Sequence, residues 1–222
     1  KAYERELAGG EKQKESVRGL LSAPKVLAER YGRIYISFER PISLKEFLAG
    51  RGEDSPDSDK RKMVATLAHR IIYDISRASV VTPSAVLAPV LLGHRQRGLS
   101  SKVVTERVQF IRKVAKDSGA RISEVLSDAA SSDPTQPGSI QDAMERFEKD
   151  GLVSKQTAGG ETVYRVIDEK RPLMVFYKNN LMHVLAARSI VAMALVSMKG
   201  EAVLDKLRER AKFLSRLLKL EF

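Results

Sequence analysis

The sequence predicts a mixed α/β protein that is mostly helical. Several long stretches carry apolar residues at helical spacing, one short stretch alternates apolar with polar residues, and a hairpin pattern surrounds Gly159 and Gly160. At 222 residues, 43% of them hydrophobic, the chain can bury the core of one large domain or two small ones. No internal repeat is visible, so a repeat architecture is not expected.

The first fifty residues predict a helix followed by a strand. Residues 11–32 have a helical pattern that ends in a glycine, a common C-cap residue. Residues 34–38 then alternate apolar with more polar side chains, which is the period of a strand, and Pro41 ends that pattern. Ser43 predicts the N-cap of a short helix that reaches residue 50.

The middle of the chain predicts helices separated by polar segments. Residues 51–62 are polar and rich in turn formers, so we expect an exposed loop there. Thr82 and Ser100 are predicted N-caps of two of the helices that follow. Apolar residues recur at helical spacing over residues 62–79, 81–98 and 99–119.

The last third predicts a helix, a hairpin and a helical tail. Residues 139–167 read as a helix that leads into a β-hairpin. Residues 168–222 form a C-terminal helical region, and its final helix, residues 201–222, is basic and amphipathic. An amphipathic basic helix can lie on an anionic membrane, although such a stripe more often packs on a core.

The charge balance is strongly basic. The chain has 39 Lys and Arg against 28 Asp and Glu, which gives a net charge of +11. Such a charge attracts phosphate in any form, including nucleic acid, lipid headgroups and small phosphorylated substrates. The charge alone does not choose among these partners.

Composition excludes several kinds of chemistry. The absence of cysteine excludes disulfides, thiolate metal sites and cysteine nucleophiles. His69, His94 and His183 are scattered without metal-ligand spacing, so we predict no metal and no cofactor. The most apolar run, residues 184–198, is shorter than the roughly 20 residues that span a bilayer and contains Arg188. We therefore expect an intracellular protein that is soluble or peripheral.

Residues 69–74 form an H-x4-D pattern that suits a histidine base oriented by an aspartate. The surrounding residues predict one continuous helix, in which positions five apart are rotated by roughly 140° about the axis. His69 and Asp74 therefore cannot easily meet. We predict that both are helix-surface residues and that no catalytic residue lies in this chain.

Residues 81–167 follow the order helix, short link, helix, loop, helix, hairpin, which resembles a winged helix-turn-helix. The helix in the recognition position carries more acidic than basic residues, which DNA phosphates would repel. A winged-helix nucleic-acid-binding protein is therefore our alternative hypothesis, and we expect no nucleic acid as partner. Three helices and a hairpin also form a common packing unit without any such ligand.

The segment "FYKNN", residues 176–180, places a lysine beside two asparagines near an apolar run. These groups suit a phosphate, but capping of a helix that starts near Leu181 by one asparagine is the plainer explanation.

Five segments together resemble one family. They are "YERELAGGEKQKES", "YGRIYISFERPISL", "LAHRIIYDISRASVVTPSAVLAPVLL", "VFYKNNLMH" and "FLSRLLKLEF". They follow in this order in bacterial membrane-associated glycerol-3-phosphate acyltransferases, so the resemblance runs from end to end. It is specific because separate segments fit in sequence.

The resemblance implies a particular place for this chain. In that family the first of these segments follows the acyltransferase motifs, so the true H-x4-D, the glycine-arginine block and the Glu-Gly block would lie upstream. We therefore expect a C-terminal fragment that is inactive alone. Residues 1–50 would be the end of an α/β acyltransferase domain, followed by a loop over 51–62, a helical region with a winged-helix-like hairpin unit over 63–167, and a C-terminal helical region over 168–222.

The resemblance also implies an activity and its partners. The family transfers a fatty acyl group from acyl-CoA or acyl-carrier protein to the first hydroxyl of glycerol 3-phosphate, which makes lysophosphatidic acid for phospholipid biosynthesis. We expect a peripheral protein on the cytoplasmic side of the inner membrane, with the membrane surface as a further partner. The acyl donor and the choice between glycerol phosphate and dihydroxyacetone phosphate stay open.

The resemblance carries over nine positions. Lys12 is our candidate for binding the substrate phosphate, and a salt bridge to Glu11 or Glu15 is an equal alternative. The other positions match the family motifs without an assigned role: Glu6, Gly9, Glu15, Ser16, Tyr177, Lys178, Asn179 and Asn180. One departure is Glu39, which stands where the family usually has glycine after Phe38, so a close backbone approach there is doubtful.

Overall fold

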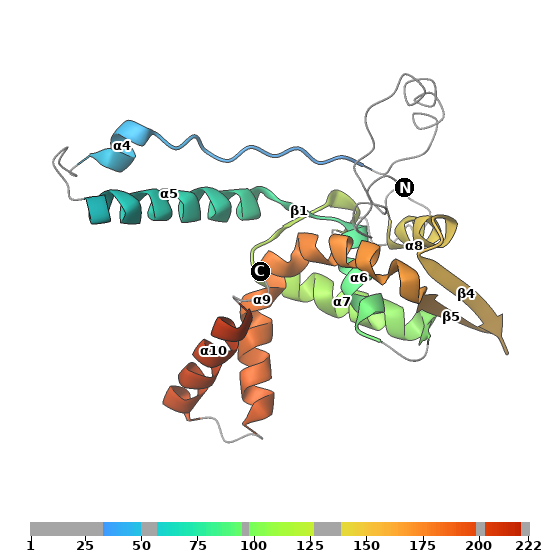
Figure 1. Cartoon of the computed structure of the whole chain (residues 1–222). Coiled ribbons are helices and arrows are strands. Elements are labelled where there is room, and N and C mark those ends of the chain that lie inside the picture. Colours follow the sequence, from blue (N-terminus) through green and yellow to red (C-terminus); the bar gives the residue numbers. More distant parts are fainter. Residues whose placement is uncertain (1–32, 50–56, 95–97, 127–138, 199–202, 219–222) are drawn as a thin grey trace.

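The computed structural model describes residues 33–49, 57–94, 98–126, 139–198 and 203–218 (Figure 1). Within these residues the protein is mostly helical with two small sheets, as the sequence predicts. A central body contains α6 to α9 and the sheets, and two extensions project from it: an arm that ends in α5 and a helical hairpin formed by the end of α9 with α10 (Figure 1). The helix expected over residues 11–32 lies outside the described residues.

Helix α6, Pro83–Leu92, is the centre of the body. Four consecutive residues, 85–88, are at most 1% exposed, so the helix is surrounded on all sides. This agrees with a sequence that is apolar all round rather than amphipathic. The Thr82 hydroxyl accepts a hydrogen bond from the amide of Ala85 at 3.4 Å, which confirms the predicted cap. The helix ends at Leu92, earlier than the predicted residue 98.

Two further helices cover α6. Helix α7, Ser101–Asp117, begins at the predicted Ser100 cap and buries Val104, Val108 and Ala115. Helix α8, Ile140–Lys149, buries Ala143, Met144 and Phe147. The Ser139 hydroxyl accepts from the amide of Asp142 at 3.1 Å and caps α8.

The larger sheet joins residues from three places in the chain. It contains β2, Leu99–Ser100, β4, Val153–Ala158, and β5, Glu161–Val166, in the order β2-β5-β4 with antiparallel pairing. Gly159 and Gly160 have φ angles of 61° and 80°, which a two-residue type I′ turn requires. The predicted hairpin is thereby confirmed. A second, two-stranded sheet pairs β1, Val80–Val81, in parallel with β3, Arg121–Ile122.

Helix α9, Arg171–Ser197, follows the short 3-10 helix η2, Asp168–Lys170, and packs its first half on α6. Met174 and Leu181 are completely buried there. Its second half leaves the body and pairs with α10, Leu204–Leu218 (Figure 1). Another 3-10 helix, η1, Glu124–Leu126, follows β3.

We call residues 33–49 and 57–79 the arm. It consists of an extended segment, the short helix α4, Leu44–Leu48, and the long helix α5, Asp57–Ala78. Figure 1 shows the arm reaching away from the body, with its extended segment running alongside α5. Ser43 caps α4 as predicted, because its hydroxyl accepts from the amide of Glu46 at 3.3 Å.

Two predictions for the arm are wrong. Residues 34–38 are extended, but they pair with no strand among the described residues, so the predicted strand is not formed. The alternating pattern sets the local conformation, whereas a strand also needs a neighbour to complete its hydrogen bonds. Residues 57–62, expected in a loop, form the first turns of α5. Lysine and arginine at 60–62 are good helix formers, and this outweighs the turn-forming residues nearby.

Candidate functional site

Tyr177 attaches α9 to α8. Its ring lies 5.1 Å from the ring of Phe147, centroid to centroid, and Phe176 makes an edge contact with it at 5.9 Å. Burial raises the pKa of the Tyr177 hydroxyl, and the nearby charge of Asp150 raises it further. This first residue of the motif at 177–180 therefore has a packing role.

The rest of that motif does not converge on one point. Lys178, Asn179 and Asn180 are consecutive residues in the middle of α9, so the helix turns them to different directions. Both asparagines are exposed. The predicted helix start near Leu181 is wrong, because α9 already begins at Arg171, with a proline in the position that favours initiation. Neither asparagine caps a helix.

Replacing Tyr177 by phenylalanine should reduce the loss of stability at alkaline pH. The pKa of Tyr177 is raised in the folded state. Its contribution to the free energy of unfolding is therefore complete below the ordinary pKa of 10.0 and is lost as pH rises through the folded pKa. Urea unfolding at about pH 9 and about pH 11 measures this. The unmodified chain should lose more unfolding free energy between these values than Tyr177→Phe. Equal losses would contradict the assignment.

His69 and Asp74 do not form a catalytic pair. The Nδ1 atom of His69 lies 2.8 Å from the carbonyl oxygen of Ala65, one turn earlier in α5. The Asp74 carboxylate accepts a hydrogen bond from Nε of Arg70 at 2.7 Å, and this bond, together with the charge of Asp74, raises the pKa of Arg70. Each side chain thus has a partner within its own helix. His69 is exposed, as predicted for a helix-surface residue, whereas the Asp74 side chain is only 14% exposed.

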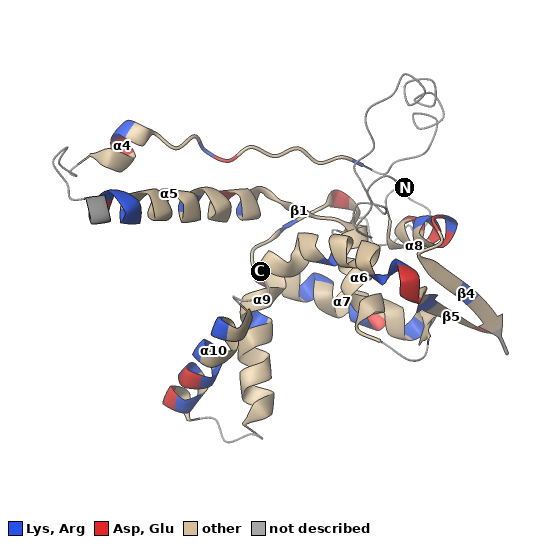
Figure 2. Ribbon diagram, viewed as in Figure 1, with Lys and Arg blue, Asp and Glu red and all other residues tan. Residues whose placement is uncertain are grey.

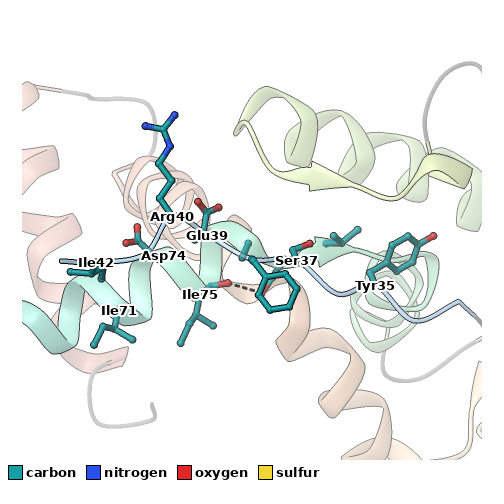
Figure 3. Close-up of a pocket in the computed structure, with 12 residues that line it drawn as sticks. Tyr35, Ser37, Glu39, Arg40, Ile42, Ile71, Asp74 and Ile75 are labelled. Atoms are coloured by element: carbon teal, nitrogen blue, oxygen red, sulfur yellow. Dashed lines mark hydrogen bonds between the residues drawn. The ribbon is translucent and has the colours of Figure 1, made fainter. Parts of the chain in front are cut away.

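The arm contains two grooves between its extended segment and α5. Figure 3 shows the smaller, a pocket of about 410 Å³ with Asp74 and Glu39 at one side and an apolar wall. The larger, of about 950 Å³, is more polar. Acidic and basic side chains line this larger groove. Its arginines come from the arm and from β3: Arg40, Arg70, Arg77 and Arg121.

Ion pairs join the arm to the body. Arg121 donates to the Glu39 carboxylate at 2.6 Å, and Arg33 donates to Glu124 at 3.4 Å. Glu39 therefore has a partner 82 residues away. Neither pair could be predicted from the sequence, because no local pattern indicates which arginine a distant glutamate contacts.

Among the described residues, no histidine is hydrogen-bonded to a carboxylate, the arrangement that would activate an alcohol. No cluster of histidine and acidic residues suited to a metal occurs within them. His183 lies on α9, and burial lowers its pKa, which disfavours a charged imidazole. The predicted phosphate-binding Lys12 and its neighbours Glu6, Gly9, Glu15 and Ser16 lie outside the described residues. Their roles stay predictions.

Comparison with known proteins defines the family. Residues 3–222 match the family described as the glycerol-3-phosphate acyltransferase C-terminal region. A putative acyltransferase, plsB1, of Mycobacterium tuberculosis (strain ATCC 25618 / H37Rv) is 30% identical over 222 residues, which is 98% of this chain and 34% of the relative. This chain belongs to the glycerol-3-phosphate acyltransferase C-terminal region family.

Other relatives carry the full name glycerol-3-phosphate acyltransferase. The glycerol-3-phosphate acyltransferase of Actinobacillus pleuropneumoniae serotype 5b is 27% identical over 198 residues, covering 86% of this chain and 23% of that protein. The protein of the same name in Xanthomonas campestris pv. campestris is 29% identical over 201 residues, covering 86% and 22%. The chain thus spans about a third of the length of the mycobacterial relative and less than a quarter of the other two.

Proposed function

We propose that this chain is part of a glycerol-3-phosphate 1-O-acyltransferase. The complete enzyme transfers an acyl group from a CoA or acyl-carrier-protein thioester to the first hydroxyl of glycerol 3-phosphate, and lysophosphatidate is released into phospholipid synthesis. The observation that supports this most is the family match over residues 3–222, which is far longer than a single motif. The net charge of +11 suits phosphorylated substrates and an anionic membrane.

Residues 1–50 form the end of the acyltransferase domain in this proposal. Its support is the exposed apolar side of the extended segment, where Ile34, Ile36 and Phe38 are 84%, 76% and 87% exposed. Three large apolar side chains on one side of an extended segment are costly to leave in water. They suit a strand that joins the edge of a sheet, where other side chains of the domain cover its apolar side. The acyltransferase domain supplies that sheet.

The chain contributes binding and support rather than alcohol activation. His69 and Asp74 are each occupied within α5, so the base that deprotonates the substrate hydroxyl lies in another part of the enzyme. Lys12 holds the substrate phosphate as a fixed cation, with a salt bridge to Glu11 or Glu15 as the competing role. The enzyme works at the cytoplasmic side of the cell membrane.

A winged-helix nucleic-acid-binding protein is the second candidate. The order α6, β2, α7, α8, β4, β5 with sheet order β2-β5-β4 is compatible with that fold. Figure 2 shows acidic as well as basic residues on α8, the helix in the recognition position. Acidic side chains there oppose phosphate contacts, so this candidate is the weaker one.

An acyl-transfer assay tests the proposal. The complete product of the gene that encodes this chain should release thiol from an acyl thioester when glycerol 3-phosphate is present and should form lysophosphatidate. Glycerol, which lacks the phosphate, is the control acceptor and should react at least about tenfold more slowly, because the phosphate supplies binding energy used in the transition state. Equal rates with both acceptors, or no transfer to glycerol 3-phosphate, would contradict the proposal.

A further inference from the structure

The helical hairpin exposes large apolar side chains far from the body. Met193 and Val196 on α9 are 62% and 76% exposed, and Phe213 and Leu217 on α10 are 51% and 48% exposed. Figure 1 shows both helices projecting beyond the remaining elements. In the described part of the chain, no other element packs against this end of the hairpin closely enough to bury these side chains.

A hydrogen bond indicates that these residues share one side of the hairpin. Nε of Arg210 donates to Oγ of Ser197 at 3.2 Å, so the Arg210 side of α10 lies next to the Ser197 side of α9. Met193 precedes Ser197 by one turn, with Val196 three residues after Met193. On α10, helical spacing places the following residues along one line: Lys206, Arg210, Phe213 and Leu217.

We call this side the hairpin face. It consists of four apolar and two basic residues: Met193, Val196, Lys206, Arg210, Phe213 and Leu217. The Arg210 guanidinium lies 5.6 Å from the centre of the Phe213 ring, so charge and apolar surface adjoin directly. Long basic side chains can keep their charge at a polar boundary while their stems and the neighbouring apolar groups enter an apolar phase.

The charge of α10 is complementary to an anionic surface. The helix, on which Figure 2 shows blue and red positions, carries five basic residues and two acidic ones, a balance of +3. One of the acidic residues, Asp205, pairs with Arg208 at 3.5 Å. Such a combination of exposed apolar residues and cations is typical of helices that lie in the interface of an anionic bilayer.

The position of α9 favours lying on the membrane over crossing it. Residues 168–197 form the one helix, within the part of the chain that the structure describes, that is long and apolar enough to cross a bilayer. However, its first half packs on α6 and buries Met174 and Leu181 in the body. Only the second half is available to lipid, and this is too short to span a hydrocarbon core of about 30 Å.

We propose that the hairpin face docks the protein on an anionic lipid bilayer. The four apolar side chains of the hairpin face enter the boundary between headgroups and acyl chains. Its two basic side chains, Lys206 and Arg210, contact the lipid phosphates. The inference rests on the proposed function and deepens it, because it names the surface that holds the enzyme at the bilayer that receives its lipid product. Binding of the chain to vesicles does not require acyl transfer, so the two proposals can fail separately.

A single tryptophan reports on this docking directly. The chain contains no tryptophan, so Phe213→Trp introduces the only indole. The matched control is Phe110→Trp on α7, since Phe110 is 67% exposed and lies outside the hairpin. Each variant of the 222-residue chain is mixed with vesicles of phosphatidylglycerol or of phosphatidylcholine. Tryptophan emission is recorded in each mixture, and brominated lipids serve as a quencher of indoles that enter the bilayer.

We expect the emission of Phe213→Trp to shift to the blue and to be quenched with phosphatidylglycerol vesicles, and Phe110→Trp to change little. Adding Lys206→Gln and Arg210→Gln should weaken the binding roughly tenfold or more, because each cation near an anionic surface contributes to affinity. Lys102→Gln with Lys113→Gln on α7 is the charge control and should weaken it less.

Three results would overturn the proposal. The first is no change in Phe213→Trp emission with phosphatidylglycerol. The second is an equal response to phosphatidylcholine, which would remove the role of the cations. The third is a blue shift that grows with protein concentration in the absence of vesicles, since this would assign the hairpin face to a second copy of the chain.

Discussion

Phe147→Ala is expected to lower the free energy of unfolding by about 3–5 kcal/mol. Phe147 is 2% exposed and lies on the buried side of α8, against the Tyr177 ring of α9. Its removal leaves a cavity at the point where these two helices meet, and the loss is a large part of the stability of a typical domain. Urea unfolding followed by circular dichroism measures the change.

Phe110→Ala is the matched control for this prediction. The same side chain is deleted, but Phe110 is 67% exposed on α7, so the change should stay within about 0.5 kcal/mol. If the two variants were equally stable, Phe147 would not be the core residue that joins α8 to α9.

Much of the fold could be predicted because it depends on local chemistry. Ser43, Thr82 and Ser100 each offer a hydroxyl to the first free amides of a helix, and a short sequence window contains both partners. Gly159 and Gly160 permit the positive φ angles of a tight hairpin, so the turn could be located from two residues.

Two of the predictions are wrong because distant residues decide the structure. Residues 34–38 have the alternation of a strand, yet a strand also requires a neighbour that these residues alone cannot specify. In α9, Asn179 and Asn180 are poor helix formers, so the local sequence predicts that a helix starts just after them. Packing on α6, and the contact of Tyr177 with Phe147 of α8, keep the helix continuous through both residues.

The candidate site could be predicted only in part. Helix geometry was sufficient to separate His69 from Asp74, and the structure agrees. The bond between Glu39 and Arg121 could not be found in this way, because it joins the arm to β3 across 82 residues. The role of Lys12 is still a prediction.

Placing charges on the apolar side of the arm should abolish activity of the complete enzyme. In Ile36→Asp with Phe38→Asp, two carboxylates replace side chains that we expect to be covered by the acyltransferase domain, and burial of unpaired charges is very costly. We expect acyl transfer to fall by about a hundredfold or more, because a loss of about 3 kcal/mol in docking already gives that factor.

The same two substitutions should leave the isolated 222-residue chain unaffected. Both side chains are already exposed there, so its unfolding free energy should change by no more than about 0.5 kcal/mol. Full acyl transfer by the doubly substituted enzyme, or a large destabilisation of the isolated chain, would contradict the placement of the arm.

The most direct test of the whole account is the acyl-transfer rate of the 222-residue chain by itself. Thiol release from an acyl thioester is measured with and without glycerol 3-phosphate, for the chain and for its His69→Ala variant. The account predicts no release that depends on glycerol 3-phosphate from either protein. Release by the unmodified chain that disappears in His69→Ala would show that the catalytic base lies in α5, and our division of roles would be wrong.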